Sequence, residues 1–136
     1  MMLVDGNVVL DLVTSDPVWG DWSNARIDEA LSAGPLFITD IVYAELAVRD
    51  ARVDDLEAML AGIGLQLART PRAALHVAAQ AFGRLLANGG RRTSVIPDFF
   101  IGAHAVVEGW PLLTRDPKPF RRYFPQVRLI TPPANP

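Results

Sequence analysis

Five short apolar runs recur along this chain, and longer segments with helical signals separate them. The runs occupy residues 2–4, 36–38, 65–67, 111–114 and 127–130. Runs of this length are typical of buried strands, and their alternation with helices requires right-handed crossovers between parallel strands. The sequence therefore predicts an α/β fold in which helices cover both faces of a five-stranded parallel sheet.

Capping residues, prolines and glycines mark the expected helix boundaries. Asn7 predicts the N-cap of a helix over about 8–14, and the pair Asp16 and Pro17 predicts the start of a helix that Gly34 ends. Thr39 is expected to cap a helix that reaches about residue 50. The other helices are expected at about 53–61, at about 71–88, from about 97 to 109, and as a short turn after Pro117.

The composition limits the class of protein. With 136 residues, of which 50% are hydrophobic and 21% charged, the chain has the size and balance of one globular domain. The absence of cysteine excludes disulfide frameworks, cysteine-ligated zinc and thiol nucleophiles. No apolar run approaches the roughly 18–20 residues of a membrane span, and no basic leader precedes the first strand. We expect one domain over 1–130 and a tail over 131–136, in a cytoplasmic protein without a membrane segment.

Charge is distributed unevenly along the chain. Residues 1–68 carry a net charge of -9 and residues 69–136 carry +7, which together make the formal -2. Such asymmetry indicates an anionic partner for the basic half, or two halves that interleave in the fold and solvate different faces. Both interpretations remain open at this point.

Two acidic residues directly follow predicted strands. Asp5 comes after the first strand and Asp116 soon after the fourth, so both fall at the carboxyl edge of the sheet. Open α/β folds place their binding sites at this edge. Asp98 lies at the start of the helix that leads into the fourth strand, and is therefore expected near the same edge.

A fourth acid is expected to point to the same place. On the helix that starts at Thr39, Glu45 shares a face with Ile41, Ala44 and Val48. A glutamate on an apolar face needs a partner, because burial of an unpaired charge costs several kcal/mol. Since this helix begins where the second strand ends, Glu45 is expected to reach towards Asp5.

Four carboxylates at one edge require a cation. Two of them 4 Å apart repel by about 4 kcal/mol at an effective dielectric constant near 20. An all-oxygen set with no cysteine favours Mg²⁺ or Mn²⁺ over zinc, and such an ion activates a nucleophile against a phosphodiester. The alternative is that these are four unrelated cap and surface acids.

Other chemistries fit the sequence less well. Asp5, Gly6 and Asn7 also resemble a phosphotransfer loop, but the second acid and a well-placed lysine are missing. His76 and His104 could drive metal-free RNA cleavage, yet both fall inside predicted helices. No glycine-rich phosphate loop has the required strand, helix and lysine.

Four blocks of this sequence resemble PIN-domain ribonucleases, in particular the VapC toxins of bacterial toxin–antitoxin pairs. The blocks lie at residues 3–11, 43–46, 96–105 and 113–117, and the last continues into a VapC-like segment over 120–125. The resemblance spans nearly the whole chain. It implies a PIN-like five-stranded parallel sheet and a Mg²⁺- or Mn²⁺-dependent endoribonuclease.

The resemblance also assigns residues and partners. It implies that the catalytic and metal-binding acids are Asp5, Glu45, Asp98 and Asp116, and that Asn7 and Thr114 support them. The family commonly has threonine or serine where this chain has Gly6, which removes a hydroxyl beside the first aspartate. A homodimer, an RNA substrate and a small cognate antitoxin that covers the active-site groove are further implied.

Two questions about surfaces follow from the remaining residues. Six cations flank the two C-terminal acids, either to hold RNA phosphates or as a solvated or docking surface. They are Arg91, Arg92, Arg115, Lys118, Arg121 and Arg122. Trp19 and Trp22 are expected on one helix face, as core or interface residues.

The alternative function for this chain is a PIN-like module that binds protein without catalysis.

Overall fold

The computed structural model describes residues 1–90 and 96–133, and within them five strands form one parallel sheet. The strand order is β3-β2-β1-β4-β5, so the sequence prediction of a five-stranded parallel sheet is confirmed. The strands are β1 (Met2–Val4), β2 (Leu36–Thr39), β3 (Leu65–Ala68), β4 (Leu112–Leu113) and β5 (Leu129–Ile130). The crossover from β3 to β4 passes over two strands, which puts β1 in the centre of the sheet.

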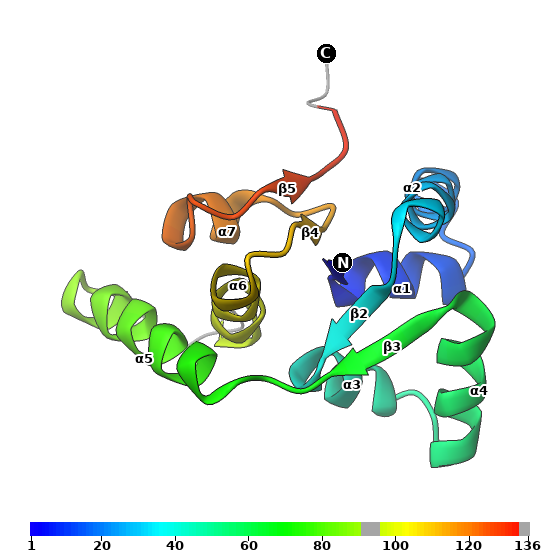
Figure 1. The fold of residues 1–136 in the computed structure, drawn as a ribbon, viewed down its shortest axis with the longest axis horizontal. Helices are drawn as coiled ribbons and strands as arrows, with labels where there is room; N and C mark the ends of the chain where they lie inside the picture. Colours follow the sequence, from blue (N-terminus) through cyan, green and yellow to red (C-terminus); the bar gives the residue numbers. More distant parts are fainter. Residues whose placement is uncertain (91–95, 134–136) are drawn as a thin grey trace.

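Helices connect these strands on both sides of the sheet. Within the described ranges they are α1 (Gly6–Val13), α2 (Gly20–Ala33), α3 (Asp40–Ala47), α4 (Val53–Ile63), α5 (Arg72–Ala87), α6 (Ile96–Glu108) and α7 (Lys118–Tyr123). In Figure 1, α5, α6 and α7 lie on one side of the strands, whereas α1, α2 and α4 lie on the other. No helix in the described ranges is long and apolar enough to cross a membrane.

Two predicted helix starts are wrong. Asp5, not Asn7, caps α1, because its carboxylate accepts a hydrogen bond from the backbone N–H of Gly6. The side chain of Asp16 instead caps a turn by accepting from the N–H groups of Val18 and Trp19, and α2 begins only at Gly20. Asp16 and Pro17 therefore belong to a turn that precedes α2, and not to the first residues of the helix.

Other boundaries agree more closely with the sequence. Thr39 caps α3 as expected, and its hydroxyl accepts from the N–H of Val42 at 3.3 Å. The helix ends earlier than predicted, at Ala47. Gly64 ends α4 in the left-handed region with φ 99°, a conformation in which glycine carries no Cβ penalty.

The two layers of helices pack on a sheet whose central strands are fully buried. Leu3 and Val4 of β1 and Leu112 and Leu113 of β4 are all 0% exposed. Among the described residues, six polar ones are nevertheless buried: Asp5, Asp11, Ser23, Thr39, His104 and Thr114. Since buried polar groups need partners, the positions of these residues point to specific polar contacts inside the molecule.

A close approach between α6 and α7 gives a test of this packing. A Cβ at Gly102 would lie 2.3 Å from the buried ring of Phe124. We expect Gly102→Ala to lower stability by about 1–3 kcal/mol, because the ring has no free space to enter. Thermal unfolding should show this as a drop of several degrees.

Gly83 provides the matched control for this substitution. It is exposed on α5, and a Cβ there would meet nothing within 4 Å. Gly83→Ala should therefore raise stability by up to about 1 kcal/mol through helix propensity alone. Equal unfolding temperatures for the two variants would contradict the proposed contact with Phe124.

Candidate active site

Asp5 and Thr114 lie side by side because they follow neighbouring strands. Val4 of β1 pairs with Leu113 of β4, and the N–H of Asp5 donates to the carbonyl of Leu113 at 2.9 Å. The hydroxyl of Thr114 donates to Asp5 Oδ2 at 2.8 Å, while the N–H of Gly6 donates to Oδ1 at 2.7 Å. Both oxygens of the Asp5 carboxylate are thus held in place.

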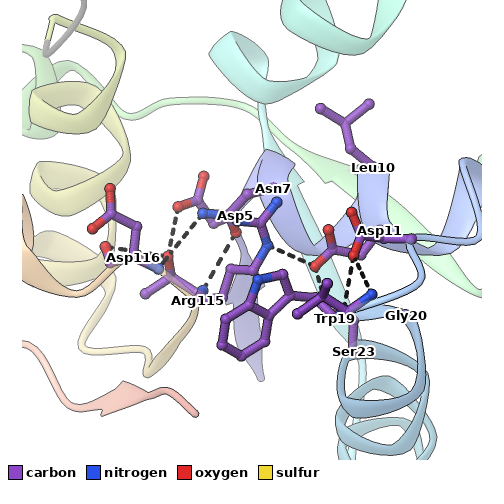
Figure 2. Close-up of polar contacts among 12 residues, drawn as sticks. Asp5, Asn7, Leu10, Asp11, Trp19, Gly20, Ser23, Arg115 and Asp116 are labelled. Carbon is purple, nitrogen blue, oxygen red and sulfur yellow. Dashed lines mark hydrogen bonds and ion pairs between the residues drawn. The ribbon is translucent and has the colours of Figure 1, made fainter. Parts of the chain in front are cut away.

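The Thr114 hydroxyl also accepts hydrogen bonds from the two residues that flank the carboxylate. Asn7 Nδ2 lies 3.4 Å from Thr114 Oγ1, and the backbone N–H of Asp116 lies 3.1 Å from it. Asn7 Oδ1 in turn accepts from the N–H of Arg115 at 3.4 Å. The two residues that the resemblance assigned as supporting therefore contact Asp5 or its neighbours directly (Figure 2).

The acids predicted from the sequence influence one another electrostatically. Burial, together with the negative charges of Asp5, Asp116 and Glu45, raises the pKa of Asp98 to about 7. Burial likewise raises the pKa of Asp5, against the hydrogen bonds from Thr114 and Gly6 that lower it. The first turn of α6 and the ends of β1 and β4 thus bring carboxylates near one edge of the sheet.

Glu45 reaches this edge for a different reason from the one predicted. The buried face of α3 carries Val42 and Leu46, whereas Glu45 is exposed and Val48 is 86% exposed. The argument from an apolar face at positions 41, 44, 45 and 48 is therefore wrong. Partial desolvation and the nearby charge of Asp5 still raise the pKa of Glu45, so its carboxylate lies at the rim of the same acidic group.

The donor set suits a hard divalent cation. Raised carboxyl pKa values mean that the ionised forms are unfavourable without a compensating charge. Oxygen-only ligands are those that Mg²⁺ and Mn²⁺ prefer. Across the described residues, no three acidic or histidine side chains stand close enough to enclose one ion without moving. The chemistry of Asp5, Glu45 and Asp98, all of them oxygen donors with raised pKa values, fits such an ion.

Sequence reasoning missed a buried ion pair next to these acids. Asp11 of α1 is 1% exposed, and its Oδ2 accepts from Arg115 Nε and from Ser23 Oγ, each at 2.8 Å. Figure 2 shows this group beside Asp5 and Asn7. One signal was available, because Asp11 is an acid between Leu10 and Leu12 on an otherwise apolar helix.

The histidines do not form a catalytic pair. His104 is 1% exposed and stacks on Trp110 with 5.9 Å between ring centroids, and burial lowers its pKa. His76 is exposed on α5. A buried histidine on one helix and an exposed one on another lack the shared access to RNA that acid–base cleavage requires.

The predicted basic and aromatic surfaces are only partly found. Arg91 and Arg92 lie outside the described residues. Lys118, Arg121 and Arg122 are exposed on α7, whereas Arg115 is paired with Asp11. Trp19 lies in the turn before α2 and Trp22 within it, so the two do not share one helix face as predicted.

Comparison with known proteins gives a family and a fold. The family model described as "PIN domain" matches residues 2–124. No curated protein matches the sequence.

Solved structures of VapBC and FitAcB proteins share the fold. VapBC2 from Rickettsia felis, bound to a promoter DNA fragment, has a TM-score of 0.73 and 18% identity, covering 96% of this chain and 97% of that one. DNA-bound VapBC from Salmonella typhimurium has a TM-score of 0.70 and 20% identity, covering 96% and 98%. FitAcB from Neisseria gonorrhoeae has a TM-score of 0.67 and 19% identity, covering 96% of each chain.

The raised pKa of Asp98 predicts how stability depends on pH without metal. The folded protein holds a proton on Asp98 up to about pH 7, whereas the unfolded chain releases it near the ordinary value of 3.8. Between these values the folded state binds more protons, so the free energy of unfolding falls as pH rises. Thermal unfolding in EDTA should show a midpoint that decreases from pH 5 to pH 8.

Asp98→Asn should make this decrease smaller, because an amide does not titrate, while Asp5 and Glu45 keep their raised pKa values. Asp21→Asn, at an exposed acid on α2, should leave the decrease as it is in the wild type. If the unfolding midpoint fell equally with pH in the wild type and in Asp98→Asn, Asp98 would not be one of the groups that titrate.

Proposed function

The chain belongs to the PIN-domain family, and on that premise we propose that it is a metal-dependent endoribonuclease acting as the toxin of a toxin–antitoxin pair. One observation carries this proposal. Burial raises the pKa of Asp98 and of Glu45, and the nearby carboxylate of Asp5, held by Thr114 and Gly6, raises both further. A group of mutually destabilised carboxylates has no structural benefit of its own, so a function that uses a cation is the better explanation.

We assign the binding of Mg²⁺ or Mn²⁺ to Asp5, Glu45, Asp98 and Asp116. When bound, such an ion would lower the pKa of a water molecule and neutralise charge that develops on the phosphate. The chain's own residues hold this set in order. Thr114 and the α1 N-terminus orient Asp5, and Asn7 ties Thr114 to the loop that carries Asp116.

Exposed cations near the acids support an RNA substrate. Lys118, Arg121 and Arg122 lie on α7, the helix that directly follows Asp116. Phosphate contacts from lysine and arginine position a nucleic acid without reading its sequence. We propose that α7 holds the RNA backbone on the side of the site where Asp116 lies.

The partners are proposed from the fold and from exposed apolar surface. One structurally similar protein is described as a toxin–antitoxin complex from Klebsiella pneumoniae and another as a member of the VapBC family of toxin–antitoxin systems, and we propose a cognate antitoxin for this chain. An apolar pocket of about 270 Å³ between α5 and α6 is lined by residues that include Leu75, Phe82 and Phe100. Exposed apolar surface of this kind is typical of contact with another chain, which supports a homodimer.

Product chemistry tests the proposed mechanism. Attack by water should leave a 5′-phosphate and a 3′-hydroxyl, so a ligase that requires a 5′-phosphate should join the products without kinase treatment. Cleavage should stop in EDTA and return with Mn²⁺. Asp5→Asn and Asp98→Asn should each lower kcat at least about 100-fold, because each removes a carboxylate that binds the ion.

Asp21→Asn serves as the control, since this exposed acid on α2 is not among the proposed ligands. It should cleave RNA at the wild-type rate. Cyclic-phosphate ends formed at full rate in EDTA would contradict the proposal, as would full Mn²⁺-dependent activity in Asp98→Asn. Failure of the wild type to bind Mn²⁺ would favour a protein-binding module.

Light scattering tests the proposed assembly. At about 50 μM, a concentration at which ordinary dimers are populated, we expect a mass twice the 14.8 kDa of one chain. A stable mass of one chain over this range would contradict the homodimer. It would leave the proposed nuclease and antitoxin untouched, since neither depends on the second copy.

A further inference from the structure

The loop between β4 and α7 is attached to α1 at two points by one residue. The backbone N–H of Arg115 donates to Asn7 Oδ1 at 3.4 Å, and its side-chain Nε donates to Asp11 Oδ2 at 2.8 Å. Asn7 and Asp11 are four residues apart, so they share a face of α1 one helical turn apart. Arg115 therefore lies along the helix whose N-terminus carries Asp5 (Figure 2).

The buried partner in this contact is Asp11. Its side chain is 2% exposed, whereas that of Arg115 is 30% exposed. Ser23 of α2 donates to the same oxygen of Asp11, and the Arg115 guanidinium lies 5.9 Å from the centroid of the Trp19 ring. Removal of one member of such a pair leaves the other desolvated and unpaired, so the pair resists separation. It joins α1, α2 and the loop after β4.

Asp116 depends on this attachment more than the other acids do. Asp5 is held through both carboxylate oxygens, and Asp98 belongs to the regular helix α6. Asp116 is exposed, and within the described part of the chain no hydrogen bond holds its carboxylate. Its placement follows from the loop backbone alone, and that backbone is fixed by its neighbours Thr114 and Arg115.

We propose that Asp11 and Arg115 are positioning residues, which hold the β4–α7 loop on α1 so that Asp116 stays beside Asp5 and Asp98. This inference rests on the proposed metal-dependent cleavage. It also separates Arg115 from the other cations that flank the site. Because its Nε is used by Asp11, Arg115 acts on the loop rather than as a mobile contact for RNA phosphate.

Mn²⁺ binding measured without RNA is the first test. Asp11→Asn and Arg115→Met should each weaken Mn²⁺ binding about tenfold by isothermal titration calorimetry, as expected for groups that orient metal ligands. The double variant should lose no more than either single variant, because both remove the same contact. Arg52→Met and Asp54→Asn alter an ion pair whose side chains are 72% and 88% exposed, and should stay within about twofold of the wild type.

Kinetics with RNA separate positioning from direct phosphate contact. Arg115→Lys keeps the positive charge but loses the guanidinium geometry that reaches Asp11. If Arg115 positions the loop, Arg115→Lys should lower kcat and Mn²⁺ affinity with little change in KM. A raised KM in Arg115→Met that Arg115→Lys restores, with Mn²⁺ affinity unchanged, would overturn the proposal in favour of an RNA contact.

Amide hydrogen exchange in the metal-free protein completes the test, and does not depend on the proposed function. The N–H groups of Arg115 and Asp116 are hydrogen-bonded to Asn7 and Thr114, and should exchange faster in Asp11→Asn and Arg115→Lys than in the wild type. Unchanged exchange together with unchanged Mn²⁺ affinity would overturn the positioning role. If the wild type neither binds Mn²⁺ nor cleaves RNA, the proposed function fails, while exchange still reports whether the pair orders the loop.

Discussion

The hydrogen bond from the Thr114 hydroxyl to Asp5 is the contact on which the rest of the site depends. It joins residues 109 positions apart in the sequence, and it exists because β1 and β4 are neighbours in the sheet. That pairing requires the long crossover through α5 and α6, which also delivers Asp98 near the same edge. The pairing of β1 with β4 therefore places Asp5 beside Thr114, and the crossover before β4 brings Asp98 near the same edge.

The sequence predicted the features that depend on local patterns. Apolar runs of three or four residues identified the strands, and the rule that parallel strands end at one edge placed Asp5 and Asp116 together. Prediction from the sequence failed where two local signals compete, or where the structure depends on a residue far away in the sequence. Asp5 and Asn7 are both good N-caps, but Asp5 caps α1, whereas the side chain of Asn7 contacts Thr114, which is far away in the sequence. The ion pair of Asp11 with Arg115 spans 104 positions, and no periodicity predicts which cation reaches a buried acid.

Helix α1 has a buried acid near each end, Asp5 and Asp11, and the two differ in whether a cation within the fold compensates the charge. Asp11 has an arginine and a serine as partners within the molecule, so its charge is compensated by the fold itself. Asp5 has hydrogen bonds but no cation bound to its carboxylate within the described residues, and burial raises its pKa. The ion pair joins the acidic half of the sequence to the basic half, which shows that the two halves interleave at this point.

The strand order has a consequence for how the molecule is made. β1 is synthesised first, and its partner on one side, β2, follows after α1 and α2. The partner on the other side is β4, which emerges from the ribosome only after β3 and the helices α5 and α6. Until then Asp5 has no hydrogen bond from Thr114, and Asp11 has no ion pair with Arg115. A nascent chain is therefore without an assembled site for most of its synthesis, and completion of the central pairing is the step that creates one.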